Sequence, residues 1–142
     1  MPDRILVPLD GSEPSWAAFE FALANHGDAD IVVLNVINPM EGVYAADPLG
    51  GDYWDGWQEN AEERAGRLFA EAEELAAESD VDLTTATEMG SPAQAIIDYA
   101  EEHDVDHVVM GSHGRKGVSR ILLGSVAELV VRRAAIPVTI VR

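Results

Sequence analysis

The sequence predicts an α/β protein built around one parallel β-sheet. Three observations support this fold class: apolar runs alternate with helical stretches, most runs are apolar on both faces, and turn signals separate them. At 142 residues the chain is predicted to form a single domain, 1–142, large enough to bury a core without a metal or disulfide. It contains no cysteine, which excludes a disulfide framework, a cysteine-ligated metal and a thiol nucleophile.

Five strands are predicted. The first, 4–9 (RILVPL), ends at a turn formed by Asp10, Gly11 and Ser12. Runs that are apolar on both faces are typical of central parallel strands, whereas the alternating pattern of 81–88 (VDLTTATE) predicts a strand at a sheet edge. The other strands are predicted at 31–37 (IVVLNVI), 105–110 (VDHVVM) and 136–141 (IPVTIV).

Four helices are predicted between these strands. The first begins at Ser12 and Pro14 and directs Trp16 and Phe19 toward the core. The second is rich in alanine and glutamate, the third begins at a Ser-Pro pair, and the fourth follows a glycine. Their predicted positions are 57–79 (with Ala61, Leu68, Ala72 and Leu75 on one face), 91 onward (with Ile96, Ile97 and Ala100 facing the core) and 125–133.

The segment from Asn38 to Gly56 is a long loop rich in glycine, proline, aspartate and aromatic residues. Loops of this length in compact domains are usually functional or mobile. Three roles are open for it: a lid over a bound ligand, a contact with a dimer partner, or packing against the second helix.

Charge is distributed unevenly along the acidic chain, whose net charge is −17. Residues 1–106 carry 25 acidic and 3 basic side chains, a net charge of −22, whereas residues 107–142 carry 1 acidic and 6 basic, a net charge of +5. Nucleic acid and anionic membranes are therefore disfavoured as partners. Lys116 is the only lysine, beside eight arginines, and this pattern suggests a halophilic adaptation to a high-salt cytoplasm. With no long apolar run or signal peptide, a cytoplasmic location is predicted.

The most informative motif follows the predicted fourth strand. It reads Gly111-Ser112-His113-Gly114, then nine residues, then Gly124-Ser125. Glycines permit unusual backbone angles and close approach to a ligand, and the N–H groups of a turn and of a helix N-terminus attract anions. The Ser125 hydroxyl is available to cap the helix or to bond a phosphate oxygen. We predict a phosphate-binding or nucleotide-binding loop; the alternative is a connecting loop that merely collects glycines and a serine cap. Three cations lie in it: Arg115, Lys116 and Arg120.

Four segments carry a resemblance to a known family: RILVPLDGS, IVVLNV, GSPAQAI and VVMGSHGRKGVSRILLGSVAELVVRRAAIPVTIV. With them, essentially the whole chain resembles the universal stress protein family, in its ATP-binding branch. The resemblance implies a doubly wound, Rossmann-like sheet of five parallel strands in the order 3-2-1-4-5, with helices on both faces. It also implies a homodimer formed through the last strand, from Ile136 to Val141. The implied ATP contacts are Gly111, Gly114, Gly124, Ser125 and Val126 at the phosphates, Asp10 with Pro8 near the ribose or a metal, Val36 at the adenine and Met110 in the pocket lining.

The position of Asp10 predicts a binding role independently of the resemblance. A carboxylate at the end of a central strand, facing the same crevice as a phosphate loop, can hold a ribose hydroxyl or Mg²⁺. The alternative is an Asx turn that closes the strand into Gly11 and Ser12, and the two roles are compatible.

Other chemistries are disfavoured by the residues at specific positions. The first strand is not followed by G-x-G-x-x-G, and neither a Walker A motif nor G-x-S-x-G occurs. A phosphoacceptor receiver domain would need a late lysine that is missing. Residues 103–107 (HDVDH) have metal-ligand side chains, but a solvated turn explains them better, and no metal site is predicted. His113 could touch a phosphate, although it is more simply a bystander.

The predicted function is therefore an ATP-binding, nucleotide-responsive stress regulator, with ATP bound alone or with Mg²⁺. No side chain near the loop is an obvious general base, so at most slow hydrolysis is expected and no catalytic residue is assigned. Two alternatives come from other classes: an interaction module whose dimer surface is the functional part, and a slow ATPase or phosphotransferase that uses Asp10 and the loop cations.

Overall fold

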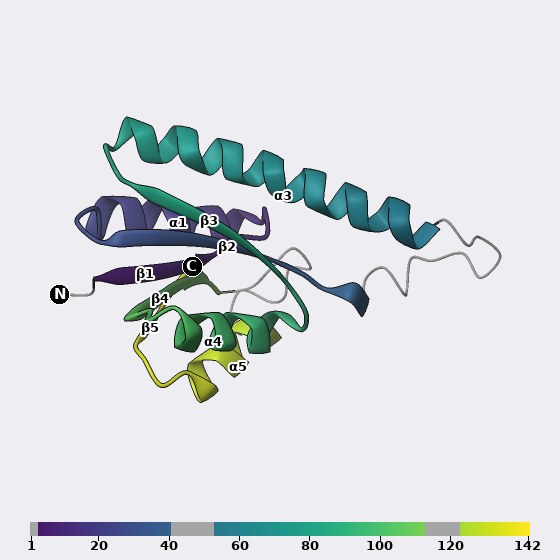
Figure 1. The fold of residues 1–142 in the computed structure, drawn as a ribbon. Coiled ribbons are helices and arrows are strands. Elements are labelled where there is room, and N and C mark those ends of the chain that lie inside the picture. Colours follow the sequence, from purple (N-terminus) through teal and green to yellow (C-terminus); the bar gives the residue numbers. More distant parts are fainter. Residues whose placement is uncertain (1–2, 41–52, 113–122) are drawn as a thin grey trace.

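The computed structural model describes residues 3–40, 53–112 and 123–142. In these ranges strands alternate with helices along the chain, as Figure 1 shows. The strands are β1 (Arg4–Pro8), β2 (Asp30–Ile37), β3 (Leu83–Met89), β4 (His107–Gly111) and β5 (Val138–Val141). The helices are α1 (Glu13–Asn25), α3 (Tyr53–Glu78), α4 (Pro92–Glu102) and α5 (Ser125–Arg133).

The strands form one parallel sheet in the order β3-β2-β1-β4-β5. The predicted fold class and strand order are confirmed, and so is the edge position of β3. Strand β1 lies at the centre, where it pairs with β2 through Ile5 and Ile31 and with β4 through Ile5 and His107. The strand order reverses at β1, so the carboxyl ends of β1 and β4 flank the topological switch point of the sheet.

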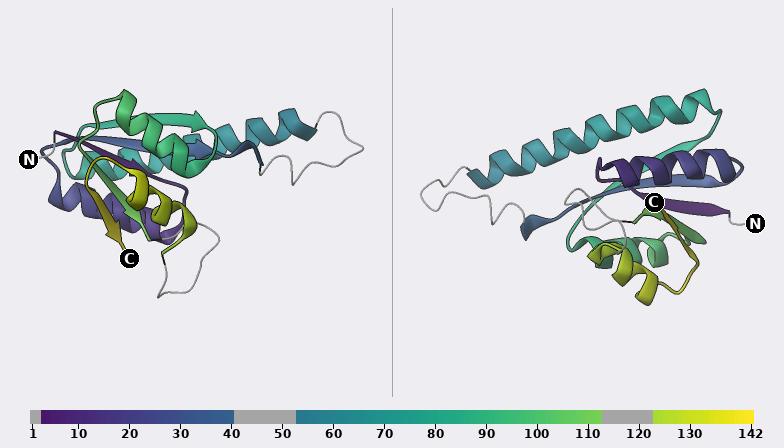
Figure 2. Two further views of the ribbon diagram at one scale, coloured as in Figure 1. Left: turned by 90° about the horizontal axis from the view of Figure 1, so that it is seen from below. Right: turned by 180° about the vertical axis from the view of Figure 1, so that it is seen from behind.

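Helices cover both faces of the sheet. Figures 1 and 2 show α1 and α3 on one face and α4 and α5 on the other. Each face has its own hydrophobic core, because successive side chains of a strand point to opposite faces. Phe19, Val33 and Val109 belong to the core under α1 and α3, and Leu34, Ile96 and Val108 to the core under α4 and α5.

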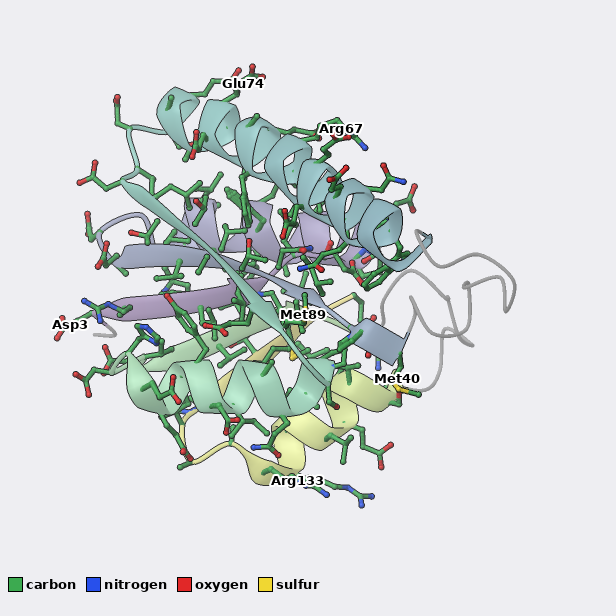
Figure 3. All side chains as sticks on the ribbon, turned by 45° about the vertical axis from the view of Figure 1, so that its right-hand side comes forward. Asp3, Met40, Arg67, Glu74, Met89 and Arg133 are labelled. Carbon is green, nitrogen blue, oxygen red and sulfur yellow. The ribbon has the colours of Figure 1, made fainter. Side chains whose placement is uncertain are left out.

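Helix α3 has one buried and one solvated side. Ala61 and Ala72 of the predicted apolar face are buried, while Leu68 is half-buried. Figure 3 shows Arg67 and Glu74 on the side of the helix that points away from the sheet. The acidic residues of this helix therefore lie on its solvated side. None of the helices in the described ranges has the length and apolar character needed to cross a bilayer.

Several element boundaries differ from the predictions. Helix α3 begins at Tyr53, so the connection after β2 is shorter than expected, and its residues 41–52 lie outside the described ranges. Strand β4 begins at 107 rather than 105 because the preceding residues close α4. Asp104 adopts a positive φ of 53°, and the Val105 N–H donates to the Ala100 carbonyl at 3.0 Å, which is a common way to end a helix.

The last strand is also shorter than predicted. It begins at Val138, so Ile136 lies outside it. The hydrogen bond from the Val108 N–H to the Pro137 carbonyl, 3.0 Å long, starts its pairing with β4. Proline has no N–H to donate to a ladder, so pairing begins with its carbonyl group alone.

Candidate functional site

The chain leaves β1 through a tight turn at the switch point. An Asp10 carboxylate oxygen, Oδ1, accepts a hydrogen bond from the Ser12 N–H at 2.9 Å, which is the predicted Asx turn. Gly11 has a φ of +88°, a conformation that favours glycine. The Ser12 hydroxyl oxygen accepts from the Ser15 N–H at 3.2 Å and caps α1. Asp10 is thus held by its own turn at the carboxyl end of the central strand.

Strand β2 holds the other side of this turn. The Leu9 N–H donates to the Leu34 carbonyl at 2.8 Å, and the Asn35 side-chain amide donates to the Leu9 carbonyl at 2.9 Å. Asn35 therefore fixes the residue immediately before Asp10. This role of Asn35 is not among the predictions from the sequence, although a signal is present there: Asn35 is the only polar residue in the run 31–37.

Gly111, at the end of β4, contacts the first turn of α1. A Cβ atom built on Gly111 would lie 2.6 Å from the carbonyl carbon of Pro14 and 2.7 Å from its Cβ. Glycine is needed here because α1 approaches the strand closely. The expected positive φ is absent from both described motif glycines, since only Gly11 and Gly90 have positive φ among the glycines that the structure describes.

Ser112 joins the end of β4 to the start of α5. Its N–H donates to the Val141 carbonyl at 3.0 Å, and its carbonyl accepts from the Gly124 N–H at 2.7 Å. The ten residues 113–122, which include Gly114 and the predicted cations of the loop, lie outside the described ranges. The bond nevertheless brings the two described ends of the motif together.

Gly124, rather than Ser125, occupies the cap position of α5, and Ser125 is the first helical residue. The predicted capping role of Ser125 is therefore wrong. Ser125 is exposed and Val126 is half-buried, and the first N–H groups of any helix have no partner within it. These donors, together with the positive end of the helix dipole, favour an anion at this end of α5.

The remaining predicted residues lie on strands around the same edge. Pro8 is the last residue of β1, and it is half-buried. Met110 is 5% exposed and packs in the core under α4 and α5, with half-buried Val36 against the same core. Val36 pairs with Glu88 of β3 in the sheet register. Their side chains thus share the face of the sheet that α4 and α5 cover.

The candidate metal ligands at 103–107 lie at the opposite edge of the sheet and have separate contacts. One Asp106 carboxylate oxygen accepts from the backbone N–H groups of Asp3 and Arg4, both at 2.9 Å. The His103 ring stacks on Tyr99 with their centroids 3.8 Å apart, and Nε2 of His107 lies 2.6 Å from the Thr139 hydroxyl oxygen. No three histidine, aspartate or glutamate side chains in the described ranges could hold a metal ion together.

Two of these groups have shifted pKa values. Burial lowers the pKa of His107 below 6.5, and the charge of nearby His26 lowers it further. Burial raises the pKa of Tyr99 above 10.0, against an opposing effect of Arg4. The His107 shift arises at the amino-terminal edge of the sheet, whereas the pKa of Tyr99 is also raised by the charge of Glu88 on β3.

The fold and the switch-point site together define a doubly wound α/β protein, a class that binds ligands beyond the carboxyl ends of its strands. The profile described as the universal stress protein family matches residues 1–142, and the chain belongs to this family.

The chain is similar to several known members. It is 34% identical over 143 residues to universal stress protein MJ0531 of Methanocaldococcus jannaschii, covering 98% of this chain and 81% of that protein. It is 32% identical over 150 residues to universal stress protein YxiE of Bacillus subtilis, covering both chains fully. The solved structure of UspA from Lactobacillus plantarum matches with a TM-score of 0.85 at 26% identity, over 98% of this chain and 97% of that chain. Each of these similarities covers at least 98% of this chain.

Proposed function

We propose that this protein binds ATP, alone or as its magnesium complex, beyond the carboxyl ends of β1 and β4 and acts as a nucleotide-responsive stress regulator. One observation carries the proposal: the 2.7 Å hydrogen bond between Ser112 and Gly124 holds the N-terminus of α5 at the end of β4. The contact of Pro14 with Gly111 brings the N-terminus of α1 to the same place. Two helix N-termini meet at one strand end, which is an environment that favours phosphate groups.

In this proposal different predicted residues contact the ribose, the adenine and the phosphates. Asp10, with Pro8 before it, lies beside the ribose or holds the magnesium ion, while Val36 borders the adenine and Met110 lines the pocket. The phosphates contact the glycine motif and the first turn of α5, through Gly111, Gly114, Gly124, Ser125 and Val126. The net charge of +5 over residues 107–142 supports an anionic ligand at this part of an otherwise acidic chain.

Proteins of the same fold support the adenine class of ligand. One universal stress protein structure was solved in complex with cAMP and one from Arabidopsis thaliana with AMP, at TM-scores of 0.73 and 0.71. At 23% and 19% identity these two establish a common fold. The triphosphate form and the regulatory role are therefore our extension for this chain.

We also propose a homodimer through the segment 136–141. Strand β5 is the outer strand on its side of the sheet, and each of its four residues is half-buried. An exposed strand edge with apolar side chains such as Val138 and Ile140 is a template for pairing with a second copy.

The nucleotide proposal is tested by denaturing the purified protein and identifying any released nucleotide, followed by calorimetric titration with ATP, AMP and cAMP. We expect ATP to be released or taken up. Failure to release or bind any of the three would refute the proposal and favour the interaction module. Released ADP that forms from added ATP would favour the slow ATPase.

A paired substitution locates the site. Gly124→Val with Ser125→Glu places bulk and negative charge at the start of α5, so we expect ATP binding to be lost. The matched control is Gly66→Val on α3 with Ser79→Glu, an exposed residue directly after that helix; a Cβ on Gly66 would meet nothing within 4 Å. Unchanged ATP affinity in the first double variant would refute the assigned site.

A further inference from the structure

A cavity of about 180 Å³ opens between the C-terminal halves of α4 and α5. It lies at the amino-terminal edge of the sheet, so it is separate from the edge that carries Asp10 and Ser112. Its floor is formed by Val108 and Val130, which are 1% and 0% exposed, and its walls are largely apolar. The cavity therefore offers a largely apolar surface to a ligand that enters from solvent.

The cavity exists because three of its lining residues are small. Ala100 of α4 and the consecutive pair Ala134 and Ala135, which follow α5, occupy positions where larger side chains would fill the space. An apolar cavity of about 150 Å³ is large enough to bind benzene in a protein interior. The space between α4 and α5 thus fits one six-membered ring or a short branched alkyl group.

The mouth of this cavity is negative. Glu101 and Asp104 line it, and neither side chain has an ion pair or hydrogen bond within the described residues. Helix α5 ends beside the cavity at Arg133, and the carbonyl groups at its C-terminus carry partial negative charge. At the end of α4 the Arg4 guanidinium already donates to the His103 carbonyl, so the negative charge there comes from the Glu101 and Asp104 side chains. A positively charged group is therefore favoured at the mouth.

The two cations at the end of α5, Arg132 and Arg133, do not neutralise the negative charge at the mouth of the cavity. Arg132 pairs with Glu128, one turn earlier on the same helix, at 2.7 Å. Figure 3 shows the Arg133 side chain extending away from α4, and no described residue forms an ion pair with it. The carboxylates of Glu101 and Asp104 remain the charged side chains that line the cavity.

We propose that this cavity is a second ligand site, which binds a small organic cation consisting of one ring or short alkyl group and a protonated amine. The apolar part occupies the space over Val108 and Val130, and the ammonium group lies at the mouth beside Glu101 and Asp104. The site is independent of the proposed nucleotide site, because the two lie at opposite edges of the sheet.

The test compares three probes of equal size and different charge: benzylamine, benzyl alcohol and benzoate. Each is titrated at low ionic strength into the full chain with labelled isoleucine and valine methyl groups. We expect chemical-shift changes centred on Ile97, Val130 and Ile136, with benzylamine binding about fivefold more tightly than benzyl alcohol and benzoate least. Equal affinity of benzylamine and benzyl alcohol, or no binding of either, would overturn the proposal.

Two variants separate the apolar and electrostatic parts. Ala134→Leu fills the cavity and should abolish binding of both probes. Glu101→Gln with Asp104→Asn removes both charges, and asparagine tolerates the positive φ of position 104. This double variant should bind benzylamine and benzyl alcohol equally.

The matched controls are Ala77→Leu and Glu102→Gln, which make the same changes at exposed residues outside the cavity. Both should keep the preference for benzylamine. If the double charge variant also keeps it, or if the controls lose it, the assigned mouth is wrong even where Ala134→Leu fails to fold.

Discussion

The carbonyl carbon of Pro14 lies so close to Gly111 that a Cβ atom on the glycine would be 2.6 Å away from it. Real Cβ atoms do not tolerate such a separation from backbone, so the start of α1 and the end of β4 can meet only through a glycine. This contact belongs to the fold, and it also brings the first turn of α1 to the proposed phosphate site. Gly111 therefore has a packing role in addition to the proposed contact with phosphate.

Gly111→Ala should lower the free energy of unfolding by about 1–3 kcal/mol, because α1 must shift to accommodate the methyl group. Urea denaturation measures the change. Gly66→Ala is the matched control: Gly66 lies in the interior of α3, and a Cβ there meets nothing within 4 Å. Alanine should stabilise that helix by about 0.5–1 kcal/mol. Equal stability of the Gly111→Ala protein and the wild type would contradict the packing role.

Asp10 combines a turn with a proposed binding role, and two substitutions separate them. Asp10→Asn keeps an oxygen to accept the Ser12 N–H but removes the charge, so the turn should be retained while affinity for magnesium-bound ATP falls about tenfold. Asp10→Ala also removes the turn acceptor, so it should additionally lower stability by about 1 kcal/mol.

Calorimetry with and without Mg²⁺ measures the ATP affinity of the two Asp10 variants, and urea denaturation measures their stability. Titration with ATP in the absence of Mg²⁺ is the internal control, since Asp10→Asn should change the affinity for metal-free ATP little. An unaltered affinity of Asp10→Asn for the magnesium complex would exclude a metal-binding role for the carboxylate.

The open edge of β5 permits a selective test of the proposed dimer. The bonds from Val108 to Pro137 and from Ser112 to Val141 show that alternate residues of β5 face β4, so the N–H groups of Val138 and Ile140 point outward. Ile140→Pro removes one outward donor and leaves the ladder to β4 intact.

Sedimentation equilibrium should show the Ile140→Pro protein as a monomer with its helical circular dichroism retained. Ile140→Ala keeps the N–H and serves as the control for the lost side chain; it should remain dimeric or weaken only partly. A proline variant that associates as strongly as the wild type would rule out pairing through this edge.

The fold was largely predictable because its signals are local and repeated. Apolar runs such as 31–37 predict central strands, and the alternating 81–88 predicts an edge, which is where β3 lies. Boundaries were less predictable. Asp80 and Asp104 adopt positive φ at the ends of α3 and α4, so the following strands start two residues late. Aspartate gives a weaker signal for this conformation than glycine does.

The candidate site was predictable as a set of strand ends but not as a set of contacts. Asp10 was selected as a candidate from its position after an apolar run, and Gly111 from the glycine motif that follows another. Asn35 donates to Leu9, the residue before Asp10, from 26 residues away, and Pro14 contacts Gly111 from 97 residues away. A local pattern can mark Asn35 as the only polar residue of its apolar run, but it does not report which residue the side chain contacts. Ser125 illustrates the opposite error: a favourable capping residue stands one position inside its helix, because Gly124 occupies the cap.

The environment of His107, at the amino-terminal edge of the sheet, predicts that the stability of the protein depends on pH. Its ring lies 5.5 Å from that of His26 at the end of α1, its Nε2 atom contacts Thr139 of β5, and burial lowers its pKa. The unfolded chain therefore binds a proton at a higher pH than the folded chain does. Stability is fully present above about pH 6.5 and declines as the pH falls from there toward the lower pKa of folded His107.

The free energy of unfolding, measured between about pH 5 and pH 7.5, should fall less steeply toward acid in His107→Gln than in the wild type. His26→Gln should reduce the slope only partly, because burial is the larger cause of the shift and the His26 charge the smaller. Thr139→Val leaves His107 buried and should keep most of the slope. If His107→Gln retains the full wild-type slope, titration of the other ionisable groups accounts for the acid sensitivity, and His107 makes no contribution to it.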